Sequence, residues 1–164
     1  MEHIWLIGMM GTGKTAVGME VANRLNVGFV DSDDEVVATT GRSIASLFAE
    51  GESVFRAVEQ GVITAIAASQ GRVVATGGGV VLDQDNVETM RASGTTILLV
   101  TDPETIRDRL TDSDERPLLN AEGDIERIAR DRAGVYRESA DVTIETTGMS
   151  IEQVADRVVA CAHT

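Results

Sequence analysis

The sequence is poor in several residue types and patterns, and each shortage limits what the protein can be. Cys161 is the only cysteine among 164 residues, which excludes an internal disulfide and predicts a reducing compartment, the cytoplasm. No apolar run approaches the length of a membrane-spanning helix, so we expect a soluble protein with no membrane partner. Glu2 and His3 precede only a short apolar run, so we also expect no signal peptide. Lysine occurs once, at Lys14, among 14 basic residues.

The balance of charge is strongly acidic, with a formal net charge of −13. Such a chain is a poor partner for nucleic acid or for an anionic membrane. Its overall field also opposes an anionic small molecule, so binding of one must rest on a few locally focused basic groups. A length of 164 residues with 43% hydrophobic content predicts one domain over residues 1–164, with a substantial core. We expect that domain to be a monomer.

The residues from Gly8 to Thr15 read GMMGTGKT and match G-x-x-x-x-G-K-[ST], the phosphate-binding P-loop. An apolar, β-prone run precedes the match and an amphipathic helical run follows it, which is the structural context that the motif requires. Its glycines allow positive φ and a close approach of backbone N–H groups to an anion. Lys14 can follow the β- and γ-phosphates, and the Thr15 hydroxyl suits magnesium. The alternative is a glycine-rich turn that binds no ligand.

Strand and helix patterns alternate along the whole chain, with no internal repeat and no linker. Predicted strands cover residues 4–7, 28–31, 73–76, 96–100 and 141–144. Predicted helices cover residues 14–26, about 33–40, 44–49, 52–69, 84–92, 103–110 and 125–137, and a last helix follows the capping box at Ser150. This order predicts an α/β fold of three layers, with a five-stranded parallel sheet between helices.

Acidic residues follow two of the predicted strands. Asp31 and Asp33 stand where a strand ends, so their carboxylates could hold magnesium or accept a proton from a substrate hydroxyl. They could instead cap the next helix and compensate its dipole. Asp102 could pass as a second magnesium ligand, but Pro103 directly after it favours a helix N-cap.

A second group of candidates lies in the middle of the chain. Arg56 and Glu59 are neighbours on a predicted helix, off its apolar stripe, which favours a weak surface ion pair. Alternatively, Glu59 orients Arg56 toward an anionic substrate. The glycines Gly77 to Gly79 follow a buried strand, which indicates either a close backbone approach to a ligand or a flexible turn.

Residues 111–124 are polar and too numerous for a tight connection, so they form either a functional loop or a disordered one. In an enzyme that transfers phosphate, a mobile lid carrying Arg116 could exclude water and place positive charge on the transferring phosphoryl group.

Together these motifs resemble the shikimate kinase family over essentially the whole chain. The P-loop, the Asp-x-Asp segment at Asp31, the Phe-Arg-x-x-Glu segment at Phe55 and the glycine triplet follow the family's order and spacing. Arg-Pro-Leu at Arg116 and Tyr-Arg at Tyr136 complete the match. The resemblance implies transfer of the ATP γ-phosphoryl group to the 3-hydroxyl of shikimate, on a P-loop NTPase fold like that of nucleoside monophosphate kinases.

The resemblance also implies roles for individual positions. Positions implied to bind shikimate are Asp33, Arg56, Gly77, Gly78, Gly79 and Arg137. Positions implied to bind ATP are Gly11, Thr12, Gly13, Lys14, Thr15, Ala16, Arg109 and Arg116, with Arg109 beside the adenine. Magnesium would be held by Thr15 with Asp31 in its outer shell. The groups implied in catalysis are Lys14, Asp33 and Arg116.

Two other functions fit the same elements. The first is a kinase of another small polyhydroxy acid, such as gluconate. The paired arginines Arg56 and Arg137, together with Asp33, favour a ring acid with one carboxylate over it. The second is a nucleotide-binding regulator without catalysis, against which the intact Lys14 and Thr15 argue.

Overall fold

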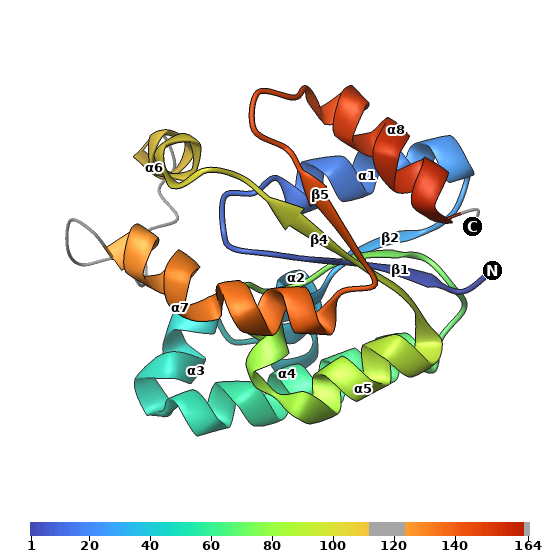
Figure 1. Cartoon of the computed structure of the whole chain (residues 1–164). Coiled ribbons are helices and arrows are strands. Elements are labelled where there is room, and N and C mark those ends of the chain that lie inside the picture. The colour runs from blue at the N-terminus through green and yellow to red at the C-terminus, as the bar shows by residue number, and fades with distance from the viewer. Residues whose placement is uncertain (112–123, 163–164) are drawn as a thin grey trace.

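A single parallel sheet carries the loops that the sequence singles out, and helices cover both of its faces (Figure 1). The computed structural model describes residues 1–111 and 124–162. Its strands are β1 (His3–Ile7), β2 (Phe29–Asp31), β3 (Val73–Ala75), β4 (Gly94–Val100) and β5 (Val142–Glu145). Their order across the sheet is β2-β3-β1-β4-β5, and every adjacent pair is parallel. The predicted three-layer α/β fold with five parallel strands is confirmed.

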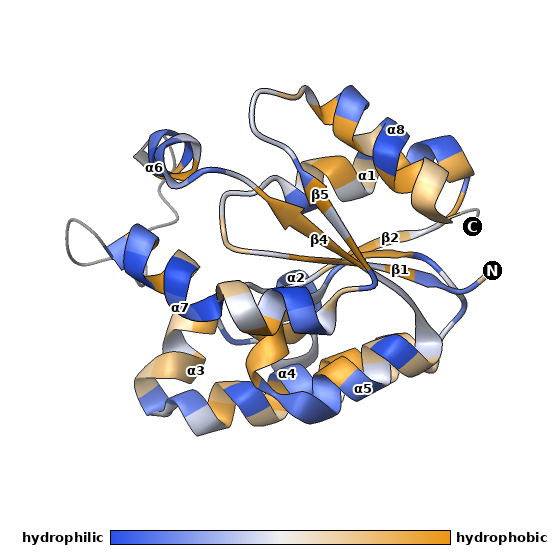
Figure 2. Cartoon of the chain, in the orientation of Figure 1, coloured by the Kyte–Doolittle hydropathy of each residue, from blue (hydrophilic) through white to orange (hydrophobic). Residues whose placement is uncertain are grey.

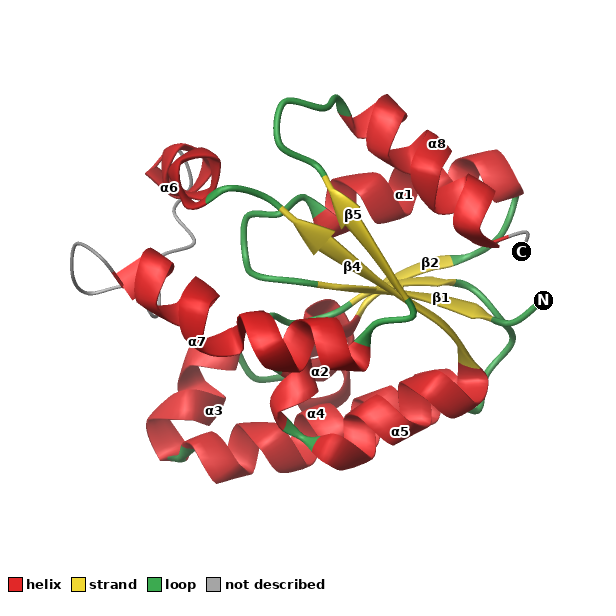
Figure 3. Ribbon diagram, in the orientation of Figure 1, coloured by secondary structure: helices red, strands yellow, loops and turns green. Residues whose placement is uncertain are grey.

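The helices of the described residues lie close to the predicted ranges (Figure 3). They are α1 (Lys14–Leu25), α2 (Ser32–Thr40), α3 (Ile44–Glu50), α4 (Glu52–Ala67), α5 (Gln84–Ser93), α6 (Pro103–Thr111), α7 (Asp124–Ser139) and α8 (Ile151–Ala162). A short 3₁₀ helix, η1 (Val80–Leu82), follows the glycine triplet and has no counterpart among the sequence predictions. No helix in these ranges is both long enough and apolar enough to cross a membrane.

Strand β1 shows why the centre of the sheet has no polar face. All five of its residues are buried, because helices cover both sides of a parallel sheet. Successive side chains point to opposite faces, so Ile4 and Leu6 join one hydrophobic cluster while Trp5 and Ile7 join the other. The strands accordingly read as apolar bands through the middle of the molecule (Figure 2).

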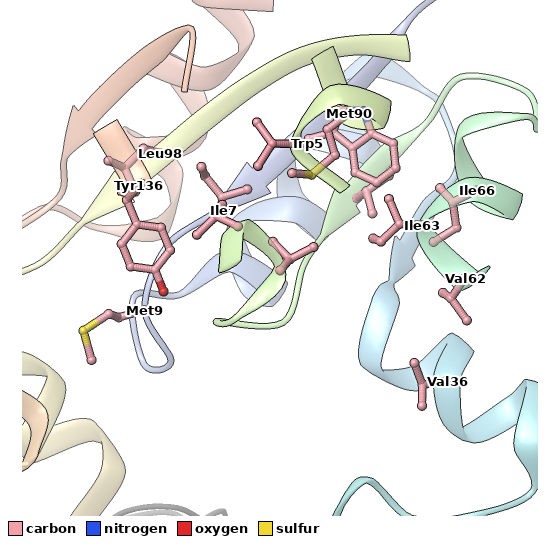
Figure 4. Close-up of a cluster of buried hydrophobic side chains, with 14 of the residues drawn as sticks. Trp5, Ile7, Met9, Val36, Val62, Ile63, Ile66, Met90, Leu98 and Tyr136 are labelled. Atoms are coloured by element: carbon pink, nitrogen blue, oxygen red, sulfur yellow. The ribbon is translucent and has the colours of Figure 1, made fainter. Parts of the chain in front are cut away.

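The two hydrophobic clusters assign the helices to their layers. Val17 and Val21 of α1 pack with Val154 and Val158 of α8 on the face of Ile4 and Leu6. The opposite cluster contains residues of α4, α5 and α7, and it is drawn in Figure 4 from Val62 at one end to Met9 and Tyr136 at the other. Apolar residues at helical spacing therefore decide which side of each helix is buried, and the polar sides face outward.

Helical glycines test this packing through stability. A methyl group added at Gly61 in α4 meets nothing within 4 Å, whereas one added at Gly18 in α1 lies 2.6 Å from the Phe29 ring. We expect Gly61→Ala to raise the free energy of unfolding by about 0.5–1 kcal/mol, because alanine favours the helix. We expect Gly18→Ala to lower it by about 1 kcal/mol through overpacking. Urea denaturation measures both values, and equal stabilisation by both variants would contradict the contact between α1 and Phe29.

Candidate active site

The P-loop connects the buried strand β1 to helix α1 and keeps its backbone open to a ligand. Gly8, Gly11 and Gly13 have φ values of 142°, 77° and 92°, which side chains other than glycine rarely adopt. Gly13 is the N-cap residue of α1, and no side chain caps this end of the helix. The first N–H groups of α1 therefore stay free for an anion, at the end of the helix where the dipole favours negative charge.

Lys14 is folded back against the loop that it follows. Its Nζ donates hydrogen bonds to the carbonyl oxygens of Gly8 and Met9, each at 2.8 Å, and the residue is 8% exposed. Burial lowers the pKa of Lys14 to about 8, although the nearby carboxylates of Asp33 and Asp31 oppose this shift. The only lysine side chain of the chain is thus held at the base of the phosphate loop.

Asp31 caps helix α2 and also accepts a hydrogen bond from the P-loop helix. Its Oδ1 accepts a hydrogen bond from the Asp33 backbone N–H at 3.0 Å, which caps helix α2. Its Oδ2 accepts a hydrogen bond from the Thr15 hydroxyl at 2.7 Å, across the gap between α1 and β2. A hydroxyl and a carboxylate side by side are the hard oxygen donors that magnesium prefers. No group of three or more His, Cys, Asp or Glu side chains suited to a metal occurs in residues 1–111 and 124–162. The pair therefore fits a magnesium ion that takes its remaining ligands from phosphate and water.

Asp33 shares one hollow with the phosphate loop. This hollow has a volume of about 400 Å³, and its lining includes Lys14, Asp31, Asp33, Gly77 and Gly78. Burial and the neighbouring Asp31 raise the pKa of Asp33 to about 6, while Lys14 opposes the rise. A side chain at Gly77 would come within 2.8 Å of the Asp33 Oδ1, so glycine is what allows this carboxylate to approach the backbone.

Arg56 is held by a carboxylate that the sequence placed on the surface, and that surface interpretation is wrong. Glu59 is 1% exposed, and its Oε2 lies 2.7 Å from Arg56 Nη1. Burial raises the pKa of Glu59, and the Arg56 guanidinium opposes the rise. The guanidinium carbon also lies 5.2 Å from the centre of the Phe55 ring and 5.9 Å from that of Phe48. Glu59 thus orients Arg56, as the second interpretation of the pair supposed.

Gly79 is required by the position of Arg56. Its φ of −101° suits any residue, but a side chain there would overlap the Arg56 guanidinium. We expect Gly79→Ala to displace Arg56 and to raise the KM for the acceptor about tenfold or more, the size of one lost charge-assisted hydrogen bond. The KM for ATP should stay within about twofold in steady-state assays, since that ligand is bound elsewhere. An unchanged acceptor KM would separate Arg56 from acceptor binding.

Helix α7 presents Arg132 and Tyr136, and not Arg137, to the glycine triplet. Arg132 Nη1 donates to the Gly78 carbonyl oxygen at 3.3 Å, and the Tyr136 hydroxyl donates to the same oxygen. Arg137 is exposed and lines a different hollow, beside the end of β4. The reason is helical geometry, because residues four apart share a face whereas the next residue is rotated by about 100°. The role of Arg137 in the acceptor site stays a prediction, and Arg132 is a further arginine at the triplet that the sequence analysis did not name.

A separate hollow lies beside the P-loop on the side of α1 and α8. Its volume is about 250 Å³, and its lining includes Gly13, Ala16, Arg109 and Ile151. Arg109 Nη1 donates to the Gly11 carbonyl oxygen at 2.9 Å, so the guanidinium is anchored to the loop itself. A ligand that extends from the phosphate cradle along α1 would enter this space, which suits the base and sugar of a nucleotide.

Two further predictions concern residues outside these hollows. Asp102 is a helix cap, as favoured, because its Oδ1 accepts a hydrogen bond from the Thr105 N–H at 2.9 Å. Arg116 and nearly all of the predicted lid at residues 111–124 lie outside the described residues. The other predicted positions from the P-loop to the glycine triplet gather at one edge of the sheet, where the carboxyl ends of β1, β2 and β3 meet.

The fold, and the residues gathered at the carboxyl edge of its sheet, define a class of protein. A P-loop with a hydroxyl and carboxylate pair beside it, in one hollow with Asp33, is the arrangement of P-loop kinases that act on small molecules. The family model for shikimate kinase matches residues 10–163. The chain belongs to the shikimate kinase family.

Individual proteins show the same relationship. The chain is 42% identical over 162 residues to the shikimate kinase of Halorhodospira halophila, covering 96% of this chain and 92% of that protein. It is 38% identical over 163 residues to that of Pelotomaculum thermopropionicum, covering 97% and 94%. Among solved structures, shikimate kinase from Acinetobacter baumannii in complex with shikimate superposes with a TM-score of 0.92 at 34% identity, covering 98% of this chain and 92% of the other.

Proposed function

We propose that this protein transfers the γ-phosphoryl group of ATP to the 3-hydroxyl of shikimate, giving shikimate 3-phosphate and ADP. The observation that carries this proposal is the single hollow in which the phosphate loop, with Lys14, faces Asp33 and the glycine triplet. Donor and acceptor groups that share one hollow can meet without an intermediate carrier, which is the arrangement needed for direct phosphoryl transfer.

The acceptor chemistry matches the side chains around the triplet. Shikimate has one carboxylate and three hydroxyl groups. We assign its carboxylate to Arg56 and Arg137, as the family resemblance implies, because a guanidinium fork suits a carboxylate. Arg132 lies against the triplet at Gly78 and is proposed as a further arginine of the acceptor site. We assign the hydroxyl groups of shikimate to Asp33. Its carboxyl group, with a pKa of about 6, is mostly ionised at neutral pH and can accept hydrogen bonds from them.

The proposed step forms one bond and breaks one. The acceptor oxygen bonds to the γ-phosphorus, the bond from that phosphorus to the β–γ bridging oxygen breaks, and the hydroxyl proton passes to Asp33. Because the transition state is loose, positioning and charge stabilisation matter more than the strength of the base. Lys14 and the N–H groups of the P-loop supply that stabilisation on the donor side. We keep Arg116 as a further cation for the phosphates, on the family resemblance alone.

Magnesium is proposed at Thr15, with Asp31 supporting it, and when bound it neutralises charge on the ATP phosphates. The base and sugar of ATP are assigned to the hollow at Arg109. We further propose a monomeric cytoplasmic enzyme, since one chain supplies every described group of both hollows and ATP is a cytoplasmic co-substrate.

An acceptor panel tests the proposal. ADP release is followed with shikimate, with gluconate and without an acceptor, in the presence of ATP and magnesium. Shikimate-dependent ADP release with a stoichiometric phosphorylated product is the expected result. Turnover of gluconate but not of shikimate would favour the other small-molecule kinase, and ATP binding without turnover of any acceptor would favour a regulator.

A further inference from the structure

A buried hydroxyl group connects two segments of the acceptor side, and the phosphoryl transfer proposed above does not use it. Ser32 stands between Asp31 and Asp33, begins helix α2 and is only 1% exposed. Its Oγ accepts a hydrogen bond from the Gly77 backbone N–H at 3.1 Å. The acidic end of β2 and the start of the glycine triplet are 45 residues apart in the chain, and this bond joins them directly.

The bond lies at the point where the sheet no longer joins these two segments. Asp31 is the last residue of β2 in the register with β3, and beyond it the chain turns into α2. On β3, the N–H of Thr76 donates to the Leu6 carbonyl oxygen of β1 at 3.1 Å. The next N–H of β3 in a buried position is that of Gly77, and Ser32 supplies the acceptor that a strand would otherwise provide. The hydroxyl therefore extends the pairing of the two segments past the end of the sheet.

Gly77 also determines where the carboxylate of Asp33 lies. A methyl group added at Gly77 would come within 2.8 Å of Asp33 Oδ1, so the carboxylate rests directly on the Gly77 backbone. The Asp33 backbone N–H is fixed by Asp31, but in residues 1–111 and 124–162 no hydrogen bond holds the carboxylate itself. Its position therefore depends on the groups that it packs against. A displacement of Gly77 would move the surface that supports Asp33.

We infer that Ser32 is a positioning residue of the acceptor site, because its hydroxyl holds the start of the glycine triplet where Asp33 and the acceptor require it. The inference rests on the function proposed above. Ser32 acts through Gly77 and Asp33, which line the shared hollow, whereas Ser32 lies behind that lining. A serine that only satisfied a buried N–H would stabilise the fold without changing the KM of one substrate relative to the other.

The test compares Ser32→Ala with the wild type in steady-state assays in which shikimate and ATP are varied in turn. Alanine leaves the Gly77 N–H unpaired, so the triplet must shift or take up water. We expect the KM for shikimate to rise about tenfold and the KM for ATP to stay within about twofold, since the bond lies on the acceptor side. Ser32→Thr keeps the hydroxyl and should return the KM for shikimate to within about threefold of the wild type.

Ser93→Ala is a matched control at the other end of the sheet. Ser93 Oγ accepts a hydrogen bond from the Trp5 indole N–H at 3.2 Å, where α5 meets the start of β4. This variant should lower the melting temperature as Ser32→Ala does, but leave both KM values unchanged. Ser32→Cys fills the space of the serine with a weak acceptor, so it should raise the KM for shikimate even where Ser32→Ala does not fold.

The bond itself is measured without any ligand, by amide hydrogen exchange in NMR. We expect the Gly77 N–H to exchange at least about tenfold faster in Ser32→Ala than in the wild type. An unchanged KM for shikimate in Ser32→Ala, or an equal rise of both KM values, would overturn the inference while the proposed function stands. A wild type that does not phosphorylate shikimate would contradict the proposed function instead. The KM of the acceptor that it does use, together with the exchange of Gly77, would then decide the role of Ser32.

Discussion

Replacing Lys14 with alanine is expected to lower kcat by about 10²- to 10³-fold, the usual cost of one lost charge-stabilising donor. No other lysine exists in the chain to take over its charge. The ammonium lies against the Gly8 and Met9 carbonyl oxygens at the base of the loop, within one hollow with Asp33. It is therefore placed to stabilise the negative charge that develops on the phosphoryl group during transfer.

The measurement is a steady-state comparison at saturating ATP and shikimate, with thermal melting to confirm that the variant is folded. Arg24 offers a matched control on the same helix, because it pairs with Glu20 and Asp156 at the other end of α1. Arg24→Ala should keep turnover within about twofold, since surface ion pairs of this kind contribute little. Turnover of Lys14→Ala near that of the wild type would remove Lys14 from the mechanism.

Replacing Arg132 with alanine is expected to raise the KM for shikimate by about 10- to 100-fold, the size of one hydrogen bond to a charged group. Arg132 reaches the Gly78 carbonyl oxygen from α7, on the side of the triplet that borders the hollow of Asp33. The KM for ATP should change much less, because the phosphate cradle belongs to a different part of the sheet edge.

The informative comparison is with two other arginines of the same helix. Arg137→Ala is expected to raise the KM for shikimate far more than the KM for ATP, as its role implied by the family resemblance requires. Arg130→Ala controls for the loss of one exposed positive charge from α7. Equal effects of Arg137→Ala on the two KM values would count against its assignment to the acceptor.

Local patterns were enough to predict the architecture. Residues 4–7 of strand β1 are an uninterrupted apolar run, and α1 and α8 carry apolar residues at helical spacing. Their burial therefore follows from properties of short segments. The P-loop is a contiguous motif whose glycines set its backbone, so its form was also predictable. The position of Asp31 and Asp33 beside the P-loop was also predictable, because the carboxyl ends of parallel strands meet at one edge of the sheet.

Sequence patterns were insufficient to predict the surroundings of three residues, Glu59, Gly79 and Arg132. The spacing of Glu59 from Arg56 is the same for a surface pair and for a buried one, and only the packing of α4 against its neighbours buries the carboxylate. The φ of Gly79 suits any residue, so the backbone alone does not require glycine there. The need for glycine follows from the tertiary structure, which places the Arg56 guanidinium beside it.

The chain by itself therefore determined the parallel sheet, the phosphate loop and the acidic strand end, because each depends on neighbouring residues and on periodicity. Tertiary structure alone decided which arginine of α7 faces the triplet, since that depends on how the helix is rotated against the sheet. A rotation of one residue, about 100°, exchanges Arg132 for Arg137, and contacts far apart in the chain are what set it.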